Sequence, residues 1–361
     1  MKTALVYPFD NGNTVLARFN MLLSEYHIEF FVAPKGRMYE QKDTNIIDGG
    51  DPTGFYITED FEKALSHADT AIFLSSSAHV TLDLMASYVA KAEALGKEIV
   101  LASSLANKFR AASIEFTYHR IIGESAPWLE PVASNRLEHI DIPVVSVYGI
   151  GESCNKFEVQ LSLRKLFLEK NRSILQIGTK EYSELFGFQC FPSFVYDYSL
   201  SLSERILMLN RYVNHLIIEQ GADVLIVGIP GGVVSLDSYF HNSFSELPYI
   251  VSCAIQPDVS ILSVYHFPKM NEDFLLELRE HMRHKYGALV DYFHISNCAY
   301  TIDNTDEVPE LVFLKQKSSL ISETMDALNA TQVSVLNVLG SRGVIVLERI
   351  YEELEMNVEV I

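Results

Sequence analysis

The sequence predicts an α/β protein built from two doubly wound domains. Short apolar, β-branched stretches alternate with amphipathic stretches along most of the chain. The alternation stops near residue 119 and starts again near residue 141. Two of the expected strands in the second half end in glycines, at 149–151 and 231–232. Short strands separated by helices are typical of parallel βαβ units, and these form doubly wound sheets.

Composition and charge limit the classes of partner. The chain has 361 residues, of which 48% are hydrophobic and 21% charged, enough for two domains with sizeable cores. A formal charge of −19 disfavours binding to nucleic acid or to an anionic membrane, so we expect neither partner. The longest uncharged apolar run, 224–236, is too short and glycine-rich to span a bilayer. No secretory signal and four scattered cysteines favour a cytoplasmic protein.

Residues 1–118 are expected to form a Rossmann-like domain. Strands are predicted at 3–9, 28–34, 70–76 and 97–103, and helices at 13–26, 59–69 and 80–96. The loop after the first strand, "PFDNGNT", lacks the GxGxxG pattern, so a dinucleotide site is not indicated. The strand ends, including Ser75 to Ser77, would still line a crevice in which small ligands bind.

Residues 119–140 break the periodicity and are predicted to be a linker, followed by a second domain over 141–361. Its strands are expected at 143–150, 173–179, 223–232, 258–268, 289–297 and 333–338. Helices are expected at 157–167, 201–221, 271–287, 319–330 and 344–355.

The first strand of this domain leads into "YGIGESCNKF", which has the layout of a phosphate-binding loop. Glycines let successive backbone N–H groups turn around an anion, the following helix contributes its positive dipole end, and a lysine reaches the terminal phosphates. We assign nucleotide binding to eight residues of the loop: Gly149, Gly151, Glu152, Ser153, Cys154, Asn155, Lys156 and Phe157.

Two positions depart from the usual pattern. Asn155 stands at the last loop glycine, but asparagine tolerates a left-handed backbone better than most residues. Phe157 stands where a serine or threonine would bind Mg²⁺, which phenylalanine cannot do. The alternative is an ordinary strand-to-helix turn whose lysine points to water.

The segment "DVLIVGIPGG" places Gly231 and Gly232 after a second strand, and we add both to the nucleotide-binding set. Asp223 precedes the strand and is predicted to be catalytic together with Lys156. Gly228 occupies the position at which an acidic residue would hold a metal. Either Asp223, Asp237 or water holds Mg²⁺, or no metal-assisted hydrolysis takes place.

The two loops resemble those of the dethiobiotin synthetase and cobyric acid synthase class of P-loop proteins, whose patterns are G-T-x-x-x-x-G-K-T and h-h-h-E-x-x-G-G. Gly149 and Lys156 match the first pattern. The resemblance implies a P-loop NTPase-like fold for the second domain, with ATP or GTP as the ligand.

Other loops supply further candidates. Thr179, Lys180 and Tyr182 follow the next strand, where proteins of this class often hold substrate, and Arg342 lies in the last loop, "LGSRG". We assign these four residues to substrate binding. Cys154, beside a lysine at a helix N-terminus, is predicted to be the most reactive cysteine.

The phrases "GIGESCNKFEVQLSLRKLF", "LQIGTKEYSELFGFQCFPSF", "DVLIVGIPGG" and "PYIVSCAIQPDVSIL" resemble the clostridial peptide maturation system protein family. That resemblance implies a role in processing a small peptide natural product. A small peptide or amino acid and peptide-modifying enzymes are therefore the expected partners. The sequence leaves the oligomeric state open, and a homo-oligomer is one alternative.

Three functions remain open at this point. The chain could activate a carboxylate of a peptide or amino acid with a nucleotide, and Lys156 would then stabilise the transferred phosphoryl group. It could instead bind a nucleotide without hydrolysis and respond to it. The third alternative is a scaffold that binds no ligand.

Overall fold

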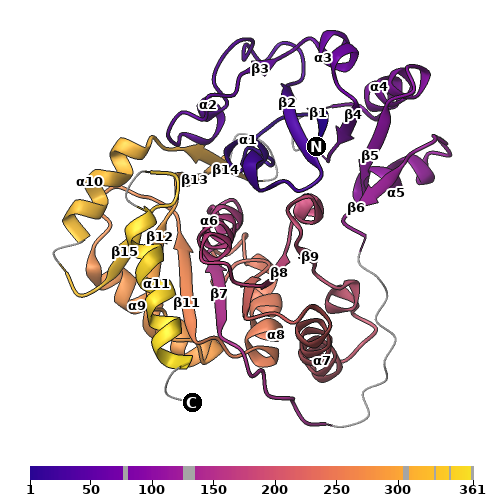
Figure 1. Ribbon diagram of the computed structural model, residues 1–361. Helices are drawn as coiled ribbons and strands as arrows, with labels where there is room; N and C mark the ends of the chain where they lie inside the picture. The colour runs from indigo at the N-terminus through magenta and orange to yellow at the C-terminus, as the bar shows by residue number, and fades with distance from the viewer. Residues whose placement is uncertain (76–79, 125–134, 304–308, 329–330, 341–342, 359–361) are drawn as a thin grey trace. The chain divides into compact units, whose positions relative to one another are not determined.

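The computed structural model of the chain describes residues 1–75, 80–124, 135–303, 309–328, 331–340 and 343–358 (Figure 1). Contacts within the chain define two compact units. The first is Met1–Glu124 with Lys180–Cys190, and the second is Ser125–Thr179 with Phe191–Ile361. Each unit contains one predominantly parallel sheet, which confirms the predicted α/β class with two doubly wound domains.

The sheet of the first unit has six parallel strands in the order β3-β2-β1-β4-β5-β6. This is the strand order of Rossmann folds, in which the winding reverses beside the first strand. The strands are β1 Lys2–Tyr7, β2 Tyr26–Val32, β3 Ile57–Thr58, β4 Thr70–Phe73, β5 Glu98–Ala102 and β6 Arg120–Ile122. β1 is buried from Ala4 to Tyr7, as expected for a central strand covered on both faces. β6 lies inside the interval 119–140 that we predicted to be a linker.

Short helices connect these strands. They are α1 Val15–Arg18, η1 Asn20–Leu22, α2 Asn45–Asp48, α3 Phe61–His67, α4 Leu82–Ala94, α5 Ser103–Ala111 and η2 Glu181–Phe186. The carboxylate of Asp60 caps α3, and the hydroxyl of Thr81 caps α4, each accepting a bond from a backbone N–H of the first turn. The single helix predicted over 13–26 is replaced by α1 and η1, because the backbone of Phe19 is not helical.

The strands of the second unit have the order β15-β12-β11-β7-β10-β8 in their sheet. They are β7 Val144–Gly149, β8 Ile174–Gly178, β10 Val224–Gly228, β11 Val259–Val264, β12 Tyr292–Ile295 and β15 Ser334–Leu336. The short strand β9 Gln189–Cys190 follows β8 at the end of the order and lies in the segment Lys180–Cys190 of the first unit. β7 lies between β10 and β11 and is parallel to both; Val147 pairs with Gly228, and Gly149 pairs with Ser263. The loops that follow these strands therefore meet at one edge of the sheet.

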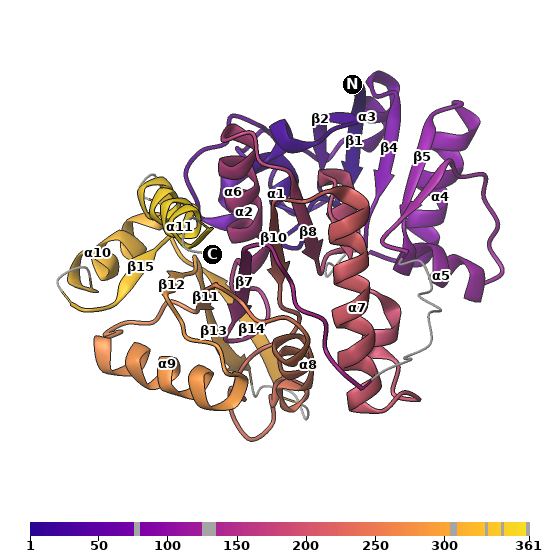
Figure 2. The ribbon, with the colours of Figure 1, turned by 60° about the horizontal axis from the view of Figure 1, so that its bottom comes forward.

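Helices cover both faces of this sheet (Figure 2). They are η3 Ser193–Tyr196, η4 Asn242–Ser245, α6 Lys156–Glu169, α7 Leu202–Gln220, α8 Glu246–Ala254, α9 Glu272–Tyr286, α10 Ser318–Leu328 and α11 Gly343–Val358. Apolar residues of α6 and α11 form the core on one face, and those of α7, α8 and α9 form the core on the other. No helix in the described ranges has both the length and the apolar character needed to cross a membrane.

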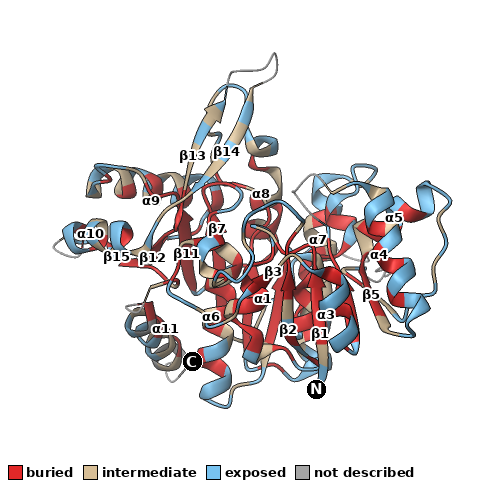
Figure 3. Ribbon diagram, turned by 90° about the horizontal axis from the view of Figure 1, so that it is seen from above, coloured by how far each residue is buried: buried red, intermediate tan, exposed pale blue. Residues whose placement is uncertain are grey.

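A two-stranded antiparallel sheet, β13 Cys298–Asp303 with β14 Glu310–Lys315, stands apart from the parallel sheet (Figure 3). The sequence did not predict it. Its side chains alternate between exposed and half-buried along β14, and Leu314 is 44% exposed. Tyr300 and Phe313 pack against Tyr265, which joins the hairpin to the core of the second unit.

Candidate functional site

The loop between β7 and α6 has the backbone of a phosphate-binding turn. Ser153 and Asn155 both have a left-handed backbone, with φ of 55° and 60°. Asn155 thus adopts the conformation for which P-loops use a glycine, as the sequence predicted. Its side chain is held on both sides. The Oδ1 atom accepts a bond of 3.0 Å from the backbone N–H of Asn297, and Nδ2 donates to Glu158 at 2.7 Å.

The two glycines of the loop are required by close packing. A Cβ on Gly149 would lie 2.5 Å from the sulfur of Cys154 and 2.6 Å from the Cδ of Lys156. A Cβ on Gly151 would lie 2.4 Å from the hydroxyl oxygen of Tyr265. That hydroxyl donates to the carbonyl of Glu152, so Tyr265 supports the loop from the β11 side. The turn is therefore compact, and no side chain larger than hydrogen fits at either glycine.

Several backbone N–H groups at this turn have no protein acceptor among the described residues. In the part of the chain that the structure describes, the N–H groups from Gly151 to Lys156 donate to no protein acceptor. They precede α6, a helix of 14 residues. The free N–H groups and the positive end of the helix dipole together favour an anion at this position.

The second glycine loop lies against the first. The ammonium of Lys156 donates to the carbonyl of Gly231, and the backbone N–H of Val233 donates to the carbonyl of Gly149 at 3.0 Å. The amide of Asn242 donates to the carbonyls of Ile150 and Val234, at 3.3 and 2.6 Å. A Cβ on Gly232 would lie 2.6 Å from the carbonyl oxygen of Ile150, so this glycine allows the close approach. The structure brings Lys156, Gly231 and Gly232 together at the edge where the sequence expected them.

The two positions that usually hold Mg²⁺ do not fit a metal. Phe157 is only 3% exposed, and its ring is part of the interior. The side chain that an acidic residue would place at position 228 has no room, because a Cβ on Gly228 would lie 2.1 to 2.5 Å from the amide of Gln160. Gln160 is itself 1% exposed, and its Oε1 has no hydrogen-bond partner.

Sequence reasoning missed Gln160. The available signal was a polar residue one helical turn after Lys156, on the face of the helix that packs against the sheet.

Two assignments made from the sequence are corrected. Asp223 precedes β10, whereas Lys156 lies beyond the opposite, carboxyl ends of the strands. The carboxylate of Asp223 accepts a bond of 2.8 Å from the backbone N–H of Ser173, so its role is to join β8 to β10. The predicted catalytic role of Asp223 is therefore wrong. Asp237, the other acidic candidate, accepts bonds of 2.7 Å from the N–H groups of Tyr239 and Phe240.

The prediction that Cys154 is the most reactive cysteine is also wrong. Its thiol is fully buried and donates to the carbonyl of Gly151 at 3.1 Å. Burial raises the pKa of this thiol above its ordinary value, in spite of the nearby Lys156 ammonium. Only the backbone of Cys154 can therefore face a ligand.

The assignment of four residues to substrate binding stays a prediction. Thr179 and Lys180 are exposed, and Thr179 belongs to the second unit while Lys180 belongs to the first. Tyr182 is 7% exposed, and its hydroxyl donates to the carbonyl of Gly12 within the first unit. That contact gives Tyr182 a structural role. Arg342 lies outside the described residues.

A buried polar network supports Asn155. The amide of Asn337 donates to the side-chain oxygen of Asn297 at 2.6 Å, and the amide of Asn297 donates to the hydroxyl of Ser318 at 3.0 Å. Asn297 lies two residues after the end of β12 and is fully buried. The network holds Asn297 in place. Its backbone N–H, which donates to Oδ1 of Asn155, is therefore held in place as well.

Comparison with known proteins supports the fold. The chain is similar to the crystal structure of a DUF1611 family protein from Anabaena variabilis, with a TM-score of 0.61 and 14% sequence identity, over 98% of this chain and 100% of that chain. At this identity the likeness establishes the fold alone. No family model and no curated protein matches the chain. Membership of the clostridial peptide maturation family therefore stays a prediction.

Two weaker likenesses are to structures with bound nucleotides. One is a nucleotide-binding protein from Archaeoglobus fulgidus in complex with ADP, at a TM-score of 0.29 and 10% identity, over 59% of this chain and 88% of that chain. The other is the signal recognition particle 54 kDa protein from Aeropyrum pernix in complex with GDP, at 0.30 and 12%, over 81% and 59%. TM-scores this low do not establish a common fold.

Proposed function

We propose that the loop from Gly149 to Lys156 binds the phosphate groups of a nucleotide, ATP or GTP, or of another phosphorylated ligand. The observation that carries the proposal is the run of N–H groups from Gly151 to Lys156 without a protein acceptor among the described residues. These groups lie in the loop that leads into α6, a helix of 14 residues that begins at Lys156. A bound phosphate would accept from these donors and lie at the positive end of the helix dipole.

The position of Lys156 supports the same ligand. Its ammonium is half-buried and donates to the neutral carbonyl of Gly231. A phosphate oxygen would offer this ammonium a charge-assisted hydrogen bond, which is about twice as strong as a bond to a neutral acceptor. Lys156 is therefore placed to exchange its contact with the second loop for a contact with the ligand.

The proposed binding does not include metal-assisted hydrolysis. Phenylalanine at 157 offers no oxygen to a metal, and Gln160 fills the space beside Gly228 from which an acidic side chain would act. No group of three or more metal-binding side chains occurs among the described residues. This donor set does not fit Mg²⁺, so we favour a protein that binds the ligand without turning it over. Activation of a carboxylate by phosphoryl transfer is disfavoured for the same reason.

The biological role is proposed from the sequence resemblance. We place the protein in the cytoplasm, in the maturation of a small peptide, where the bound nucleotide would control its association with a peptide-modifying enzyme. This role rests on the phrases shared with the clostridial peptide maturation family, and the binding proposal does not depend on it.

Isothermal titration calorimetry on the full chain tests the binding. We expect ATP, GTP or pyrophosphate to bind in the presence of EDTA, because no metal is required. Lys156→Ala should weaken binding about tenfold or more, as expected for a lost hydrogen bond between charged groups. Lys165→Ala is the matched control. Lys165 is an exposed lysine on the same helix, and its replacement removes the same charge as Lys156→Ala.

Two results would contradict the proposal. Absence of binding for all three ligands, or equal loss in both lysine variants, would contradict phosphate binding at this loop. Release of phosphate from Mg·ATP or Mg·GTP by the wild-type chain, abolished in Lys156→Ala, would contradict binding without turnover and favour the enzyme.

A further inference from the structure

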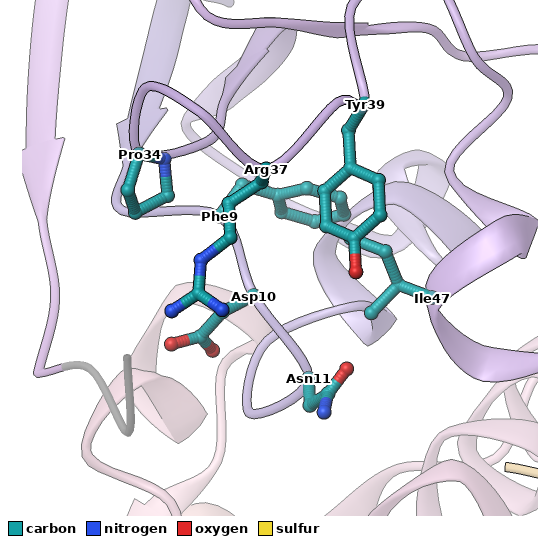
Figure 4. Close-up of a pocket in the computed structure, with 7 residues that line it drawn as sticks. All are labelled: Phe9, Asp10, Asn11, Pro34, Arg37, Tyr39 and Ile47. Carbon is teal, nitrogen blue, oxygen red and sulfur yellow. The ribbon is translucent and has the colours of Figure 1, made fainter. Parts of the chain in front are cut away.

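The first unit contains a cleft of about 160 Å³ outside the carboxyl ends of β1 and β2 (Figure 4). In open α/β sheets this is the region where ligands bind. The apolar part of the lining is Phe9, Pro34 and Ile47, and the polar part is Asp10, Asn11, Arg37 and Tyr39. All of the lining residues belong to the first unit, whereas the β7–α6 loop belongs to the second.

The loop after β1 is held in place by its own polar groups. The backbone N–H of Phe9 donates to the carbonyl of Val32 at 2.7 Å, which fixes the loop to the end of β2. The N–H of Asp10 donates to the side chain of Asn13 at 3.1 Å, and the N–H of Gly12 donates to the carboxylate of Asp10 at 2.8 Å. Asp10 and Asn11 therefore stand at defined positions on the rim.

The loop after β2 is fixed as well, and its backbone is strained. Met38 and Gln41 have a left-handed backbone, with φ of 59° and 60°. The carboxylate of Glu59 accepts from the N–H groups of Gly36 and Tyr39, at 2.8 and 2.9 Å. Residues other than glycine adopt this conformation only where the surroundings impose it, and such positions cluster at ligand sites.

These loops carry three polar side chains whose polar groups make no hydrogen bond or ion pair with the described residues of the protein. Among the described residues, the guanidinium of Arg37, the hydroxyl of Tyr39 and the amide of Asn11 have no hydrogen-bond or ion-pair partner. Figure 4 shows Arg37 beside Asp10 on one side of the cleft, with Tyr39 and Asn11 on the other. Convergent polar groups above an apolar floor are typical of a small-molecule site.

We propose that this cleft binds a small anion that carries hydroxyl groups, either a sugar phosphate or a sugar acid. The guanidinium of Arg37 would pair with the phosphate or carboxylate, since its fork matches both. Asp10 would accept from hydroxyls, and Asn11 and Tyr39 would both donate to and accept from them. The cleft volume of about 160 Å³ lies below the range of about 300–1,000 Å³ for typical pockets that bind drug-sized ligands, which favours a small ligand.

The test uses the full chain carrying Lys156→Ala, in which we expect binding at the phosphate loop to be weakened about tenfold or more. Binding at the cleft is then recognised by its dependence on Arg37. Calorimetric titrations with ribose 5-phosphate, gluconate and inorganic phosphate are compared. Binding of ribose 5-phosphate alone identifies a sugar phosphate site, and binding of gluconate alone identifies a sugar acid site. We expect Arg37→Ala to weaken binding of the preferred probe about tenfold or more, and Tyr39→Phe to weaken it about twofold to tenfold.

Lys35→Ala is the matched control, because Lys35 is an exposed cation two residues from Arg37 and does not line the cleft. It should bind the probe as the Lys156→Ala parent does. The proposal is overturned if neither organic probe binds, if Lys35→Ala weakens binding as much as Arg37→Ala, or if inorganic phosphate binds as tightly as ribose 5-phosphate. Because Arg37 and Lys35 are both exposed, neither change is expected to unfold the chain.

Discussion

Asn155 adopts the backbone conformation of a glycine and also makes side-chain hydrogen bonds that a glycine could not make. The residue takes a left-handed backbone at φ 60°, and its Oδ1 also satisfies the buried N–H of Asn297. Asparagine's tolerance of that conformation could be predicted from the sequence. The partner could not, because Asn297 lies 142 residues away along the chain.

This dual role predicts an order of stability. Asn155→Ala should lower the free energy of unfolding by about 2–5 kcal/mol. Alanine is strained by about 1–2 kcal/mol in this conformation, and the buried N–H of Asn297 loses its acceptor at a cost of about 1–3 kcal/mol. Asn155→Gly removes the hydrogen bonds without the strain and should cost less. Urea unfolding of the full chain measures both.

Asn171→Ala is the control for strain alone. Asn171 has a φ of 58° and is exposed, so its replacement should cost about 1–2 kcal/mol. If Asn155→Ala costs no more than Asn171→Ala, the bond to Asn297 does not stabilise the loop.

The wrong assignments at this scale have physical reasons. Asp223 precedes a strand of five residues, so it stands about 16 Å before the edge at which the glycines lie. The direction of the predicted strand was enough to place Asp223 at the opposite end of β10 from the glycines. The burial of Cys154 could not be predicted, because it depends on the tight turn that places its sulfur inside, next to Gly149.

At the scale of elements, the contact between α6 and β10 decides what the site can do. Gln160 fills the space above Gly228, and its Nε2 would be 2.1 Å from a Cβ at that position. The acidic residue that P-loop proteins place there is therefore excluded by a side chain of the neighbouring helix.

A double-mutant cycle tests this contact. Gly228→Ala should lower the free energy of unfolding by about 1–3 kcal/mol, because the interior is overpacked. The same change in a Gln160→Ala background should cost much less, since the space is then open. Additive effects in urea unfolding would show that Gln160 does not occupy the space beside Gly228.

The hydrophobic pattern of the sequence predicted the long, buried helices and strands, but it missed elements with few buried residues. β7, α6 and β10 were predicted because their apolar residues are buried in the core of the sheet. The β13–β14 hairpin was missed because it carries few buried residues and packs mainly through Tyr300 and Phe313. Helix α8 was also missed, because it starts after a run of left-handed residues from 242 to 245 that reads as a loop.

Over the whole molecule, each unit has a candidate ligand site at the carboxyl edge of its own parallel sheet. In the second unit this is the anion site of the β7–α6 loop, and in the first unit it is the cleft lined by Arg37. Strand direction accounts for both locations, because the carboxyl ends of parallel strands meet at one edge of a sheet. The chemistry at each site depends on single residues, namely Phe157 and Gln160 in one and Arg37 in the other.

The most direct measurement of the central claim is the response of the backbone amides in the β7–α6 loop. Amide resonances of Gly151 to Lys156 are followed by NMR while ATP or pyrophosphate is added to the full chain in EDTA. We predict that these resonances shift saturably in the wild type and that the midpoint moves to at least about tenfold higher ligand concentration in Lys156→Ala. If the ligand binds while these amides do not respond, the loop is not the phosphate site.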